Sequence, residues 1–278
     1  TGVIESVKTR DHTERMLKLF RADIKVKHPP SPRLRGIVLR SSKSEGGQNK
    51  IVIKGNKELI SPGRIFIPGD ISSASFFMVL GTILPNSRIL IKNVNLNPSR
   101  TGILEVLKRM GADIQVTLST LWRQHPPLQA TSYEPMGDII VKGGPLKGTT
   151  VKKAEIPSLI DELPILMVAA CFAKGKSIFE GVSELRVKET DRIRSMSENL
   201  RKMGANIKVL KTLKSEKIAI QGGRILKGAT VRSFGDHRTA MSMVVAGLAA
   251  GGQTRIDDIA CINKSFPNFL SLLKTIIK

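Results

Sequence analysis

Apolar and polar residues follow one another along this chain in a pattern that occurs three times. In each copy, apolar residues with helical spacing end at a glycine or its substitute, and a short strand-like stretch follows. Glycine accepts the left-handed conformation in which many helices end, so each copy predicts a helix, a tight turn and a strand. Ninety residues separate Asp23 from Asp113, and 93 separate Asp113 from Asn206. The copies are residues 19–26, 108–116 and 201–209.

The similarity extends upstream, where Asp70, Asp161 and Asp236 each precede an apolar stretch that predicts a helix. A turn and a strand follow each helix, at residues 88–91, 177–180 and 254–257. A second helix comes next, at residues 101–110, 190–203 and 267–277. The repeating unit is therefore expected to be helix–strand–helix–strand with a further hairpin.

This repeat predicts the domain organisation. Residues 1–68 hold the end of an incomplete first domain, and residues 69–278 form a second domain of three units, at about 69–145, 146–230 and 231–278. If the units pack around an axis, equivalent positions gather where helix N-termini point, which suits phosphate and carboxylate ligands. A purely structural repeat would show the same pattern. The equivalent positions, 27 or 28 residues apart within each unit, are Asp70 with Asn97, Asp161 with Lys188, and Asp236 with Lys264.

Composition narrows the class of protein. Apolar residues make up 41% of the chain, which is enough for a core and excludes a disordered chain. Two cysteines exclude a disulfide scaffold and suit a reducing compartment. No apolar run reaches the roughly 20 residues of a membrane helix. The net charge is +22, but it is spread along the chain and aromatics are only 4%, so we expect small anions rather than nucleic acid as ligands.

Several motifs are absent from the sequence. It has no Walker-type loop, no dinucleotide-binding glycine fingerprint, and no metal-ligand spacing among its histidines and cysteines. Neither cysteine has a basic neighbourhood that would mark it as a nucleophile. We therefore expect chemistry by Asp, Glu, Lys and Arg, without a cofactor or a metal.

The densest cluster of charged residues is the stretch 184–192. Lys188 and Arg192 are four residues apart, which predicts that they share a face at the start of the second helix, with Glu189 between them. Thr190 or Asp191 would cap that helix. One interpretation is a solvated, self-paired helix start. The other is an anion pocket in which a carboxylate among cations transfers protons.

Asp161 and Asp236 allow two similar interpretations. Each could be only a helix cap and dipole partner. Asp161 could instead be a base that removes a hydroxyl proton, with Arg238 pointing into the same pocket. Lys264 occupies the place in the third unit that Lys188 has in the second.

Five strings together resemble the 5-enolpyruvylshikimate-3-phosphate (EPSP) synthase family, and the resemblance runs in order along essentially the whole chain. The resemblance implies an α/β (α+β) fold, the inverse α/β barrel of the enolpyruvyl transferases, in which repeated helix–strand units surround a pseudo-threefold axis. The repeat described above suggested that pattern independently for the last three units. The strings lie at residues 9–17, 68–77, 97–102, 186–192 and 235–238.

The resemblance also implies an activity. The family adds the 5-hydroxyl of shikimate 3-phosphate to C2 of phosphoenolpyruvate as C3 is protonated, and the intermediate then loses phosphate. By resemblance, Asp161 accepts a proton near the shikimate hydroxyls, and Glu189 delivers or removes a proton at the enolpyruvyl carbon. Thr9 stands where the family usually has a serine that contacts the shikimate phosphate. Phosphoenolpyruvate would be held by Lys188, Arg192, Arg238 and Lys264. No cofactor, nucleic acid or membrane partner is implied, and we expect a monomer in the cytoplasm, or in the plastid stroma of a plant.

The chain also departs from the family pattern. The Lys-Ser pair, the arginines and the Ser/Gln cluster of the family's N-terminal part are absent from this sequence, and residues 27–43 and 117–135 align poorly and are expected to be loops. Because the family's site closes between two domains, we expect the chain alone to lack synthase activity. Two alternatives stay open: an enzyme resembling UDP-N-acetylglucosamine enolpyruvyl transferase, and a basic, non-catalytic binding fragment.

Overall fold

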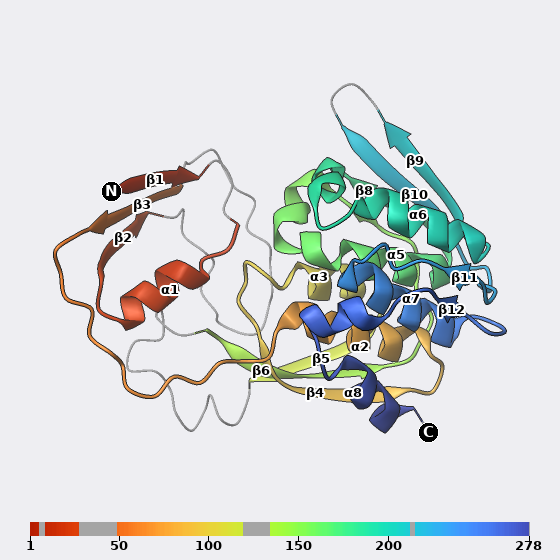
Figure 1. Cartoon of the computed structure of the whole chain (residues 1–278), viewed down its shortest axis with the longest axis horizontal. Coiled ribbons are helices and arrows are strands. Elements are labelled where there is room, and N and C mark those ends of the chain that lie inside the picture. Colours follow the sequence, from red (N-terminus) through yellow and green to blue (C-terminus); the bar gives the residue numbers. More distant parts are fainter. Residues whose placement is uncertain (6–8, 28–48, 119–133, 212–214, 278) are drawn as a thin grey trace.

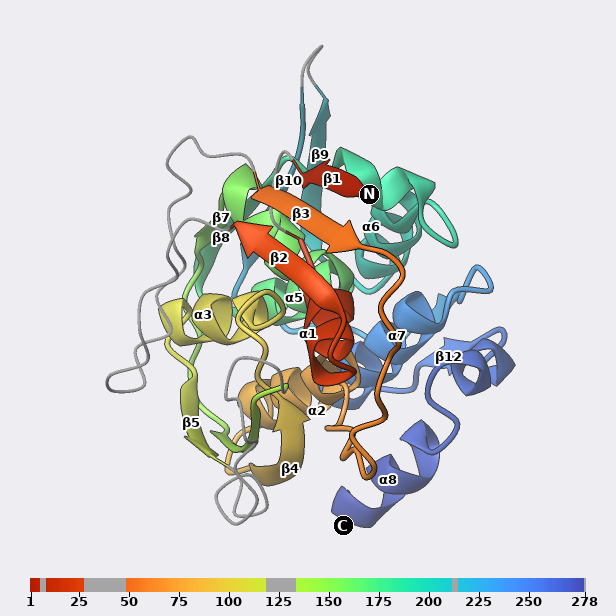
Figure 2. The same cartoon turned by 90° about the vertical axis from the view of Figure 1, so that its left-hand side faces the viewer.

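The chain folds into a small lobe and a large lobe (Figure 1). The structure is a computed structural model that describes residues 1–5, 9–27, 49–118, 134–211 and 215–277. The small lobe contains β1 (Gly2–Glu5), α1 (His12–Leu19), β2 (Asp23–Lys27) and β3 (Asn49–Lys54). Its strands form an antiparallel sheet in the order β1–β3–β2. Figure 2 views the molecule from this side and shows the three strands in front of the large lobe.

Three successive groups of elements build the large lobe. The first is α2 (Ile71–Ile83), β4 (Arg88–Asn95), α3 (Gly102–Arg109), β5 (Asp113–Leu118) and β6 (Met136–Lys142). The second is β7 (Thr150–Val151), α5 (Leu163–Phe172), β8 (Gly175–Glu180), α6 (Arg192–Lys202), β9 (Asn206–Lys211) and β10 (Glu216–Gly222). The third is β11 (Thr230–Val231), α7 (His237–Ala249), β12 (Arg255–Ile256) and α8 (Phe269–Ile276). Short 3₁₀ turns are η1 (Lys153–Ser158), η2 (Ile160–Glu162), η3 (Ser183–Val187) and η4 (Ala260–Lys264).

Each group of the large lobe forms its own sheet, and the three apolar helices pack together between the sheets. The strand orders are β4–β6–β5, β7–β8–β10–β9 and β11–β12. Helices α2, α5 and α7 each contact the other two. Nine of the ten residues of α5 are buried, which explains why its sequence is apolar on every face rather than amphipathic. Because these helices share one core, their first turns come close together.

The predicted helix ends and strands are confirmed. Gly111 and Gly204 follow α3 and α6 with φ of +93° and +91°, and Arg21 takes the same role after α1 with φ of +60°. The second helices begin one or two residues inside the predicted ranges, at Gly102, Arg192 and Phe269. The loops expected at 27–43 and 117–135 fall mainly on residues 28–48 and 119–133, which lie outside the described residues.

Candidate active site

Asp161 lies at the meeting point of the helix N-termini and is surrounded by four arginines. Its Oδ2 accepts a short hydrogen bond from Arg10 of the small lobe. Arg100 lies 3.4 Å and Arg238 3.5 Å from the same oxygen, and Arg192 lies 3.7 Å from Oδ1. Burial opposes the charged form of Asp161, but the four guanidinium groups outweigh it and hold the pKa of this carboxyl below its usual value. The arrangement is a carboxylate set in a strongly cationic pocket.

Asp161 differs from Asp70 and Asp236 in its local role. Asp70 and Asp236 cap α2 and α7, because their side chains accept hydrogen bonds from backbone N–H groups of the first turn. Asp161 lies in η2 instead, and the residue that precedes α5 is Glu162, whose side chain makes no capping bond. The apolar helix begins at Leu163, as predicted, but Asp161 is not its cap, which was one of the two interpretations of this residue. Its carboxylate pairs with the four arginines instead.

Arg192 connects three carboxylates at this site. Its Nε donates to Asp236 Oδ2 at 2.8 Å, its Nη2 donates to Glu189 Oε2 at 2.6 Å, and its Nη1 points toward Asp161. The side chain is only 1% exposed, and Asp236 is fully buried. Because Arg192 begins α6 while Asp236 precedes α7, this guanidinium fixes the two helix starts relative to each other. Glu189 and Asp161 therefore both lie next to the Arg192 guanidinium.

Lys188 is not on the helix that carries Arg192. It follows η3 in extended conformation, with φ of −83° and ψ of −164°, and α6 begins only at Arg192. Its Nζ donates to Glu184 at 2.6 Å. The prediction that Lys188 and Arg192 share a helix face is wrong. Asp191 caps α6, as one of the two predicted candidates.

Arg186 anchors the loop that precedes α6. Its Nε and Nη2 donate to the two carboxylate oxygens of Glu216 at 2.8 and 2.7 Å, and its Nη1 donates to Asp191 at 2.5 Å. Glu216 begins a distant strand, β10, so the clamp ties residues 186–191 to the sheet. A bidentate arginine–carboxylate pair has well-defined geometry, and it holds Glu189 at the edge of the pocket.

Two predicted residues, Thr9 and Lys264, stay at the periphery. The Thr9 hydroxyl is 3.5 Å from Glu5, and Lys264 ends η4 with its side chain exposed. In the part of the chain that the structure describes, no hydrogen bond or ion pair joins either side chain to Asp161. The residue after Thr9, Arg10, makes the contact instead.

Three residues at the site were missed by sequence reasoning. Arg10 and Arg100 stand inside the strings 9–17 and 97–102, and Glu162 follows Asp161 directly. Nothing in the spacing of Arg10, 151 residues from Asp161, indicated contact. Only the position of Arg100 could have indicated a place at the site, because it stands three residues beyond Asn97, one of the recurring positions.

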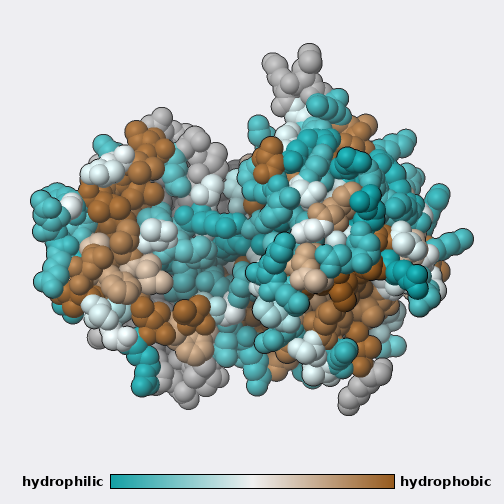
Figure 3. All heavy atoms as spheres, viewed as in Figure 1, coloured by the Kyte–Doolittle hydropathy of each residue, from teal (hydrophilic) through white to brown (hydrophobic). Residues whose placement is uncertain are grey.

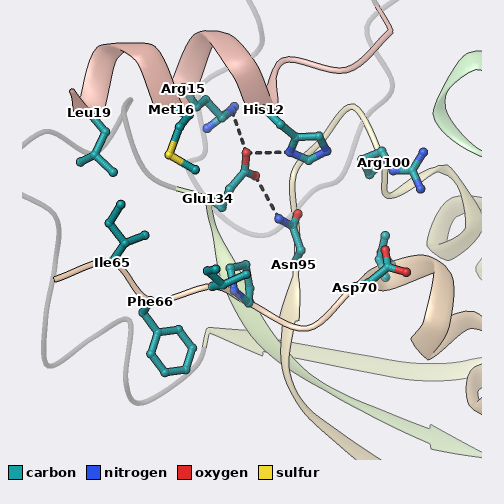
Figure 4. Close-up of a pocket in the computed structure, with 13 residues that line it drawn as sticks. His12, Arg15, Met16, Leu19, Ile65, Phe66, Asp70, Asn95, Arg100 and Glu134 are labelled. Carbon is teal, nitrogen blue, oxygen red and sulfur yellow. Dashed lines mark hydrogen bonds and ion pairs between the residues drawn. The ribbon is translucent and has the colours of Figure 1, made fainter. Parts of the chain in front are cut away.

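A polar network joins the small lobe to the large lobe beside this site. His12 Nδ1 lies 2.7 Å from Glu134 Oε1, and Asn97 Nδ2 donates to Glu134 and to Asp11, at 2.6 Å in the latter case. Burial opposes ionisation of Glu134, but hydrogen bonds from His12, Asn95 and Asn97 lower its pKa. Figure 4 shows Glu134 between α1 and β4, at the polar end of a cavity of about 270 Å³. The network holds the segment of Arg10 against the large lobe.

Other kinds of site find little support in the described residues. Burial raises the pKa of the Cys171 thiol to about 12, so this cysteine is a poor nucleophile. Within the described ranges, no group of three or more His, Cys, Asp or Glu side chains could hold a metal ion. None of the described helices combines the length and the apolarity that a bilayer crossing requires.

Comparison with known proteins places the chain beside one family. The sequence model for EPSP synthase (3-phosphoshikimate 1-carboxyvinyltransferase) matches residues 1–273. The 3-phosphoshikimate 1-carboxyvinyltransferases of Desulforamulus reducens and Petrotoga mobilis are 46% and 43% identical over 277 residues, which is 100% and 99% of this chain but 57% and 56% of those proteins. The chain therefore spans little more than half the length of these curated relatives.

Solved structures agree with the sequence comparison. The 2.37 Å structure of EPSP synthase from Acinetobacter baumannii matches with a TM-score of 0.78 and 35% identity, over 99% of this chain and 56% of that one. The enolpyruvyl transferase NikO from Streptomyces tendae matches with a TM-score of 0.67 over 99% of this chain and 55% of that one. At 15% identity, the second likeness shows the fold alone.

Proposed function

This chain belongs to the EPSP synthase (3-phosphoshikimate 1-carboxyvinyltransferase) family, and on that footing we propose that it contributes to transfer of the enolpyruvyl group of phosphoenolpyruvate to the 5-hydroxyl of shikimate 3-phosphate, with release of phosphate. The enolpyruvyl transferase fold expected from the sequence is confirmed by the structural matches. The family match favours this reaction over that of the UDP-sugar enzyme.

The observation that carries the proposal is Asp161 among Arg10, Arg100, Arg192 and Arg238. Both proposed substrates are polyanions, and guanidinium groups are well suited to phosphate and carboxylate. An anion that enters this pocket offsets the charges that lower the pKa of Asp161. Asp161 would thus become a stronger base when the substrates bind, as a proton acceptor for the 5-hydroxyl requires.

Glu189 is the proposed second proton-transfer group. It is half exposed and bonded to Arg192, so its carboxylate can reach the pocket while its loop is held by Arg186. Protonation of the enol C3 and later removal of a methyl proton need one group that both gives and takes a proton. Glu189 would do both, with Arg192 and Arg238 on the carboxylate and phosphate of phosphoenolpyruvate.

Lys188, Lys264 and Thr9 complete the proposed substrate contacts. The Lys188 ammonium is bonded to Glu184 and would have to exchange this partner for phosphoenolpyruvate. Lys264 is exposed and would approach the same anion. Thr9 precedes Arg10, so its hydroxyl would face the phosphate of shikimate 3-phosphate. Location in the cytoplasm and a monomeric state stay predictions.

The small lobe indicates that further polypeptide takes part. Its described residues include no buried apolar side chain. The two buried side chains of this lobe are both acidic, Asp11 and Glu14. Val3 is 51% exposed, and Ile67, on the segment that leads to the large lobe, is 81% exposed. Figure 3 shows apolar residues gathered on this lobe. With no buried apolar side chain among its described residues, this lobe has too little core to be stable alone. We propose that a polypeptide equivalent to the part of the relatives that this chain does not match covers it.

A phosphate-release assay tests the proposed function. We expect no turnover of phosphoenolpyruvate and shikimate 3-phosphate by the chain alone, and turnover when it is combined with the polypeptide that corresponds to the remaining part of the Desulforamulus relative. Asp161→Asn and Glu189→Gln should abolish that turnover, whereas Glu198→Gln, on the exposed face of α6, should not. Normal turnover by the chain alone would refute the need for the second polypeptide. No turnover by a combination that demonstrably associates would refute the function.

A further inference from the structure

A buried cluster of polar side chains lies beside Asp161, and two of its members, Ser72 and Glu162, have no place in the proposed chemistry. Arg100 Nη2 donates to Ser72 Oγ at 2.5 Å and lies 3.5 Å from Glu162 Oε1, and Ser72 Oγ donates to the same glutamate oxygen. The other end of the guanidinium, Nη1, lies 3.4 Å from Asp161 Oδ2. One arginine therefore spans from the first turn of α2 to the carboxylate in the pocket.

Arg100 differs from the exposed arginine at the site. Its side chain is 6% exposed, whereas that of Arg10 is 48% exposed. Water can take the place of the exposed Arg10 guanidinium at Asp161. If the buried Arg100 guanidinium moved, however, Ser72 and Glu162 would lose their hydrogen-bond donor where no water could replace it. The turn that carries Arg100 is itself fixed, because the buried Asn97 accepts from the Ser99 backbone at 2.9 Å and from the Arg100 backbone at 2.8 Å.

Glu162 is the unusual member of the cluster. It is fully buried, and its Oε2 has no hydrogen-bond partner among the described residues. Burial raises the pKa of Glu162 despite Arg100 and the hydrogen bond from Ser72. Arg100 therefore lies between two adjacent carboxyls whose pKa values shift in opposite directions.

We propose that Arg100 is a positioning residue, held by Ser72 and Glu162, that fixes the orientation and charge of Asp161. The inference rests on the proposed function, since it makes Asp161 the group that is prepared for proton transfer. Ser72 and Glu162 act through Arg100, because the hydrogen bonds of their side chains join them to Arg100 and to each other and not to Asp161.

The test uses no substrate, so its outcome is independent of whether the chain takes part in the proposed reaction. The Asp161 carboxyl carbon is followed by ¹³C NMR as a function of pH in the whole chain, and Asp161→Asn identifies its signal. Arg100→Gln should shift the titration midpoint of Asp161 upward, and Arg100→Lys, which keeps the charge but not the fork, should shift it less. Ser72→Ala should also shift it upward, although Ser72 is uncharged and does not contact Asp161.

Arg109→Gln is the matched control, because it removes the same charge from an arginine that pairs with Glu155. We expect no shift of the Asp161 midpoint in this variant. An unchanged midpoint in both Arg100→Gln and Ser72→Ala would overturn the proposal. A shift in Arg100→Gln alone would reduce Arg100 to a nearby charge and overturn the positioning role. If Arg100→Gln does not fold, the milder Ser72→Ala decides by itself.

Discussion

Arg192→Met is expected to lower the free energy of unfolding, because it removes the cation that pairs with the buried Asp236. The substitution keeps an apolar stem of similar length but removes the guanidinium that donates to Asp236 at 2.8 Å. Asp236 has no exposed surface, so its carboxylate would be left without its cation. Removing one partner of a buried pair typically costs about 3–5 kcal/mol. Asp236 keeps hydrogen bonds from the backbone N–H groups of Arg238 and Thr239, which favours the lower end, about 3 kcal/mol.

Urea unfolding followed by far-UV circular dichroism measures this loss. The midpoint should fall while the dependence on urea concentration stays similar, because the surface exposed on unfolding hardly changes. Arg194→Met is the matched control on the same helix: its pair with Glu198 is exposed, so we expect no measurable change. Asp236→Asn in the Arg192→Met background should recover part of the lost stability, since the amide carries no charge.

A specific result would refute this reasoning. If Arg192→Met loses no more stability than Arg194→Met, the Asp236 carboxylate does not depend on the guanidinium. Additive losses in Arg192→Met and Asp236→Asn would lead to the same conclusion, because residues in direct contact should couple.

Three further predictions concern a close contact, a thiol and a buried acid. Gly102→Ala should lower the melting temperature, because a Cβ there would lie 2.3 Å from Ser158 Oγ, while Gly144→Ala, which meets nothing within 4 Å, should not. Cys171 should resist a thiol reagent at pH 8 in the native chain and react in urea, since burial raises its pKa to about 12. The pKa of Glu162 is raised in the folded chain. Between the ordinary glutamate pKa and this raised value, the folded chain holds a proton that the unfolded chain has released, so the free energy of unfolding falls as the pH rises through this range. Unfolding curves over that range should show the fall in the parent and not in Glu162→Gln.

Local features of the fold were predictable because neighbouring residues decide them. Gly111 and Gly204 end helices through their own backbone conformation, and Asp191 caps α6 by accepting a hydrogen bond from the backbone N–H of Arg194, three residues away. The apolar runs of α2 and α5 predicted buried helices because no polar face was available to meet solvent.

The course of the loop before α6 could not be predicted in this way. Spacing alone suggested that Lys188 and Arg192 share a helix, but Arg186 is bonded to Glu216, 30 residues further along the chain, and this contact holds the loop of residues 188–191 outside the helix. A contact with a distant strand outweighs the local helical preference of a short segment.

The sequence by itself therefore determined the repeating elements, the helix ends, the family resemblance and the candidates Asp161, Glu189 and Arg192. The tertiary structure decided which charges meet. Arg10 and Arg100 come from segments 151 and 61 residues away, and only the packing of three helix starts and the joining of two lobes brings them to Asp161. Electrostatic interactions depend on distance in space and on burial, and neither quantity is written in the spacing of residues along a chain.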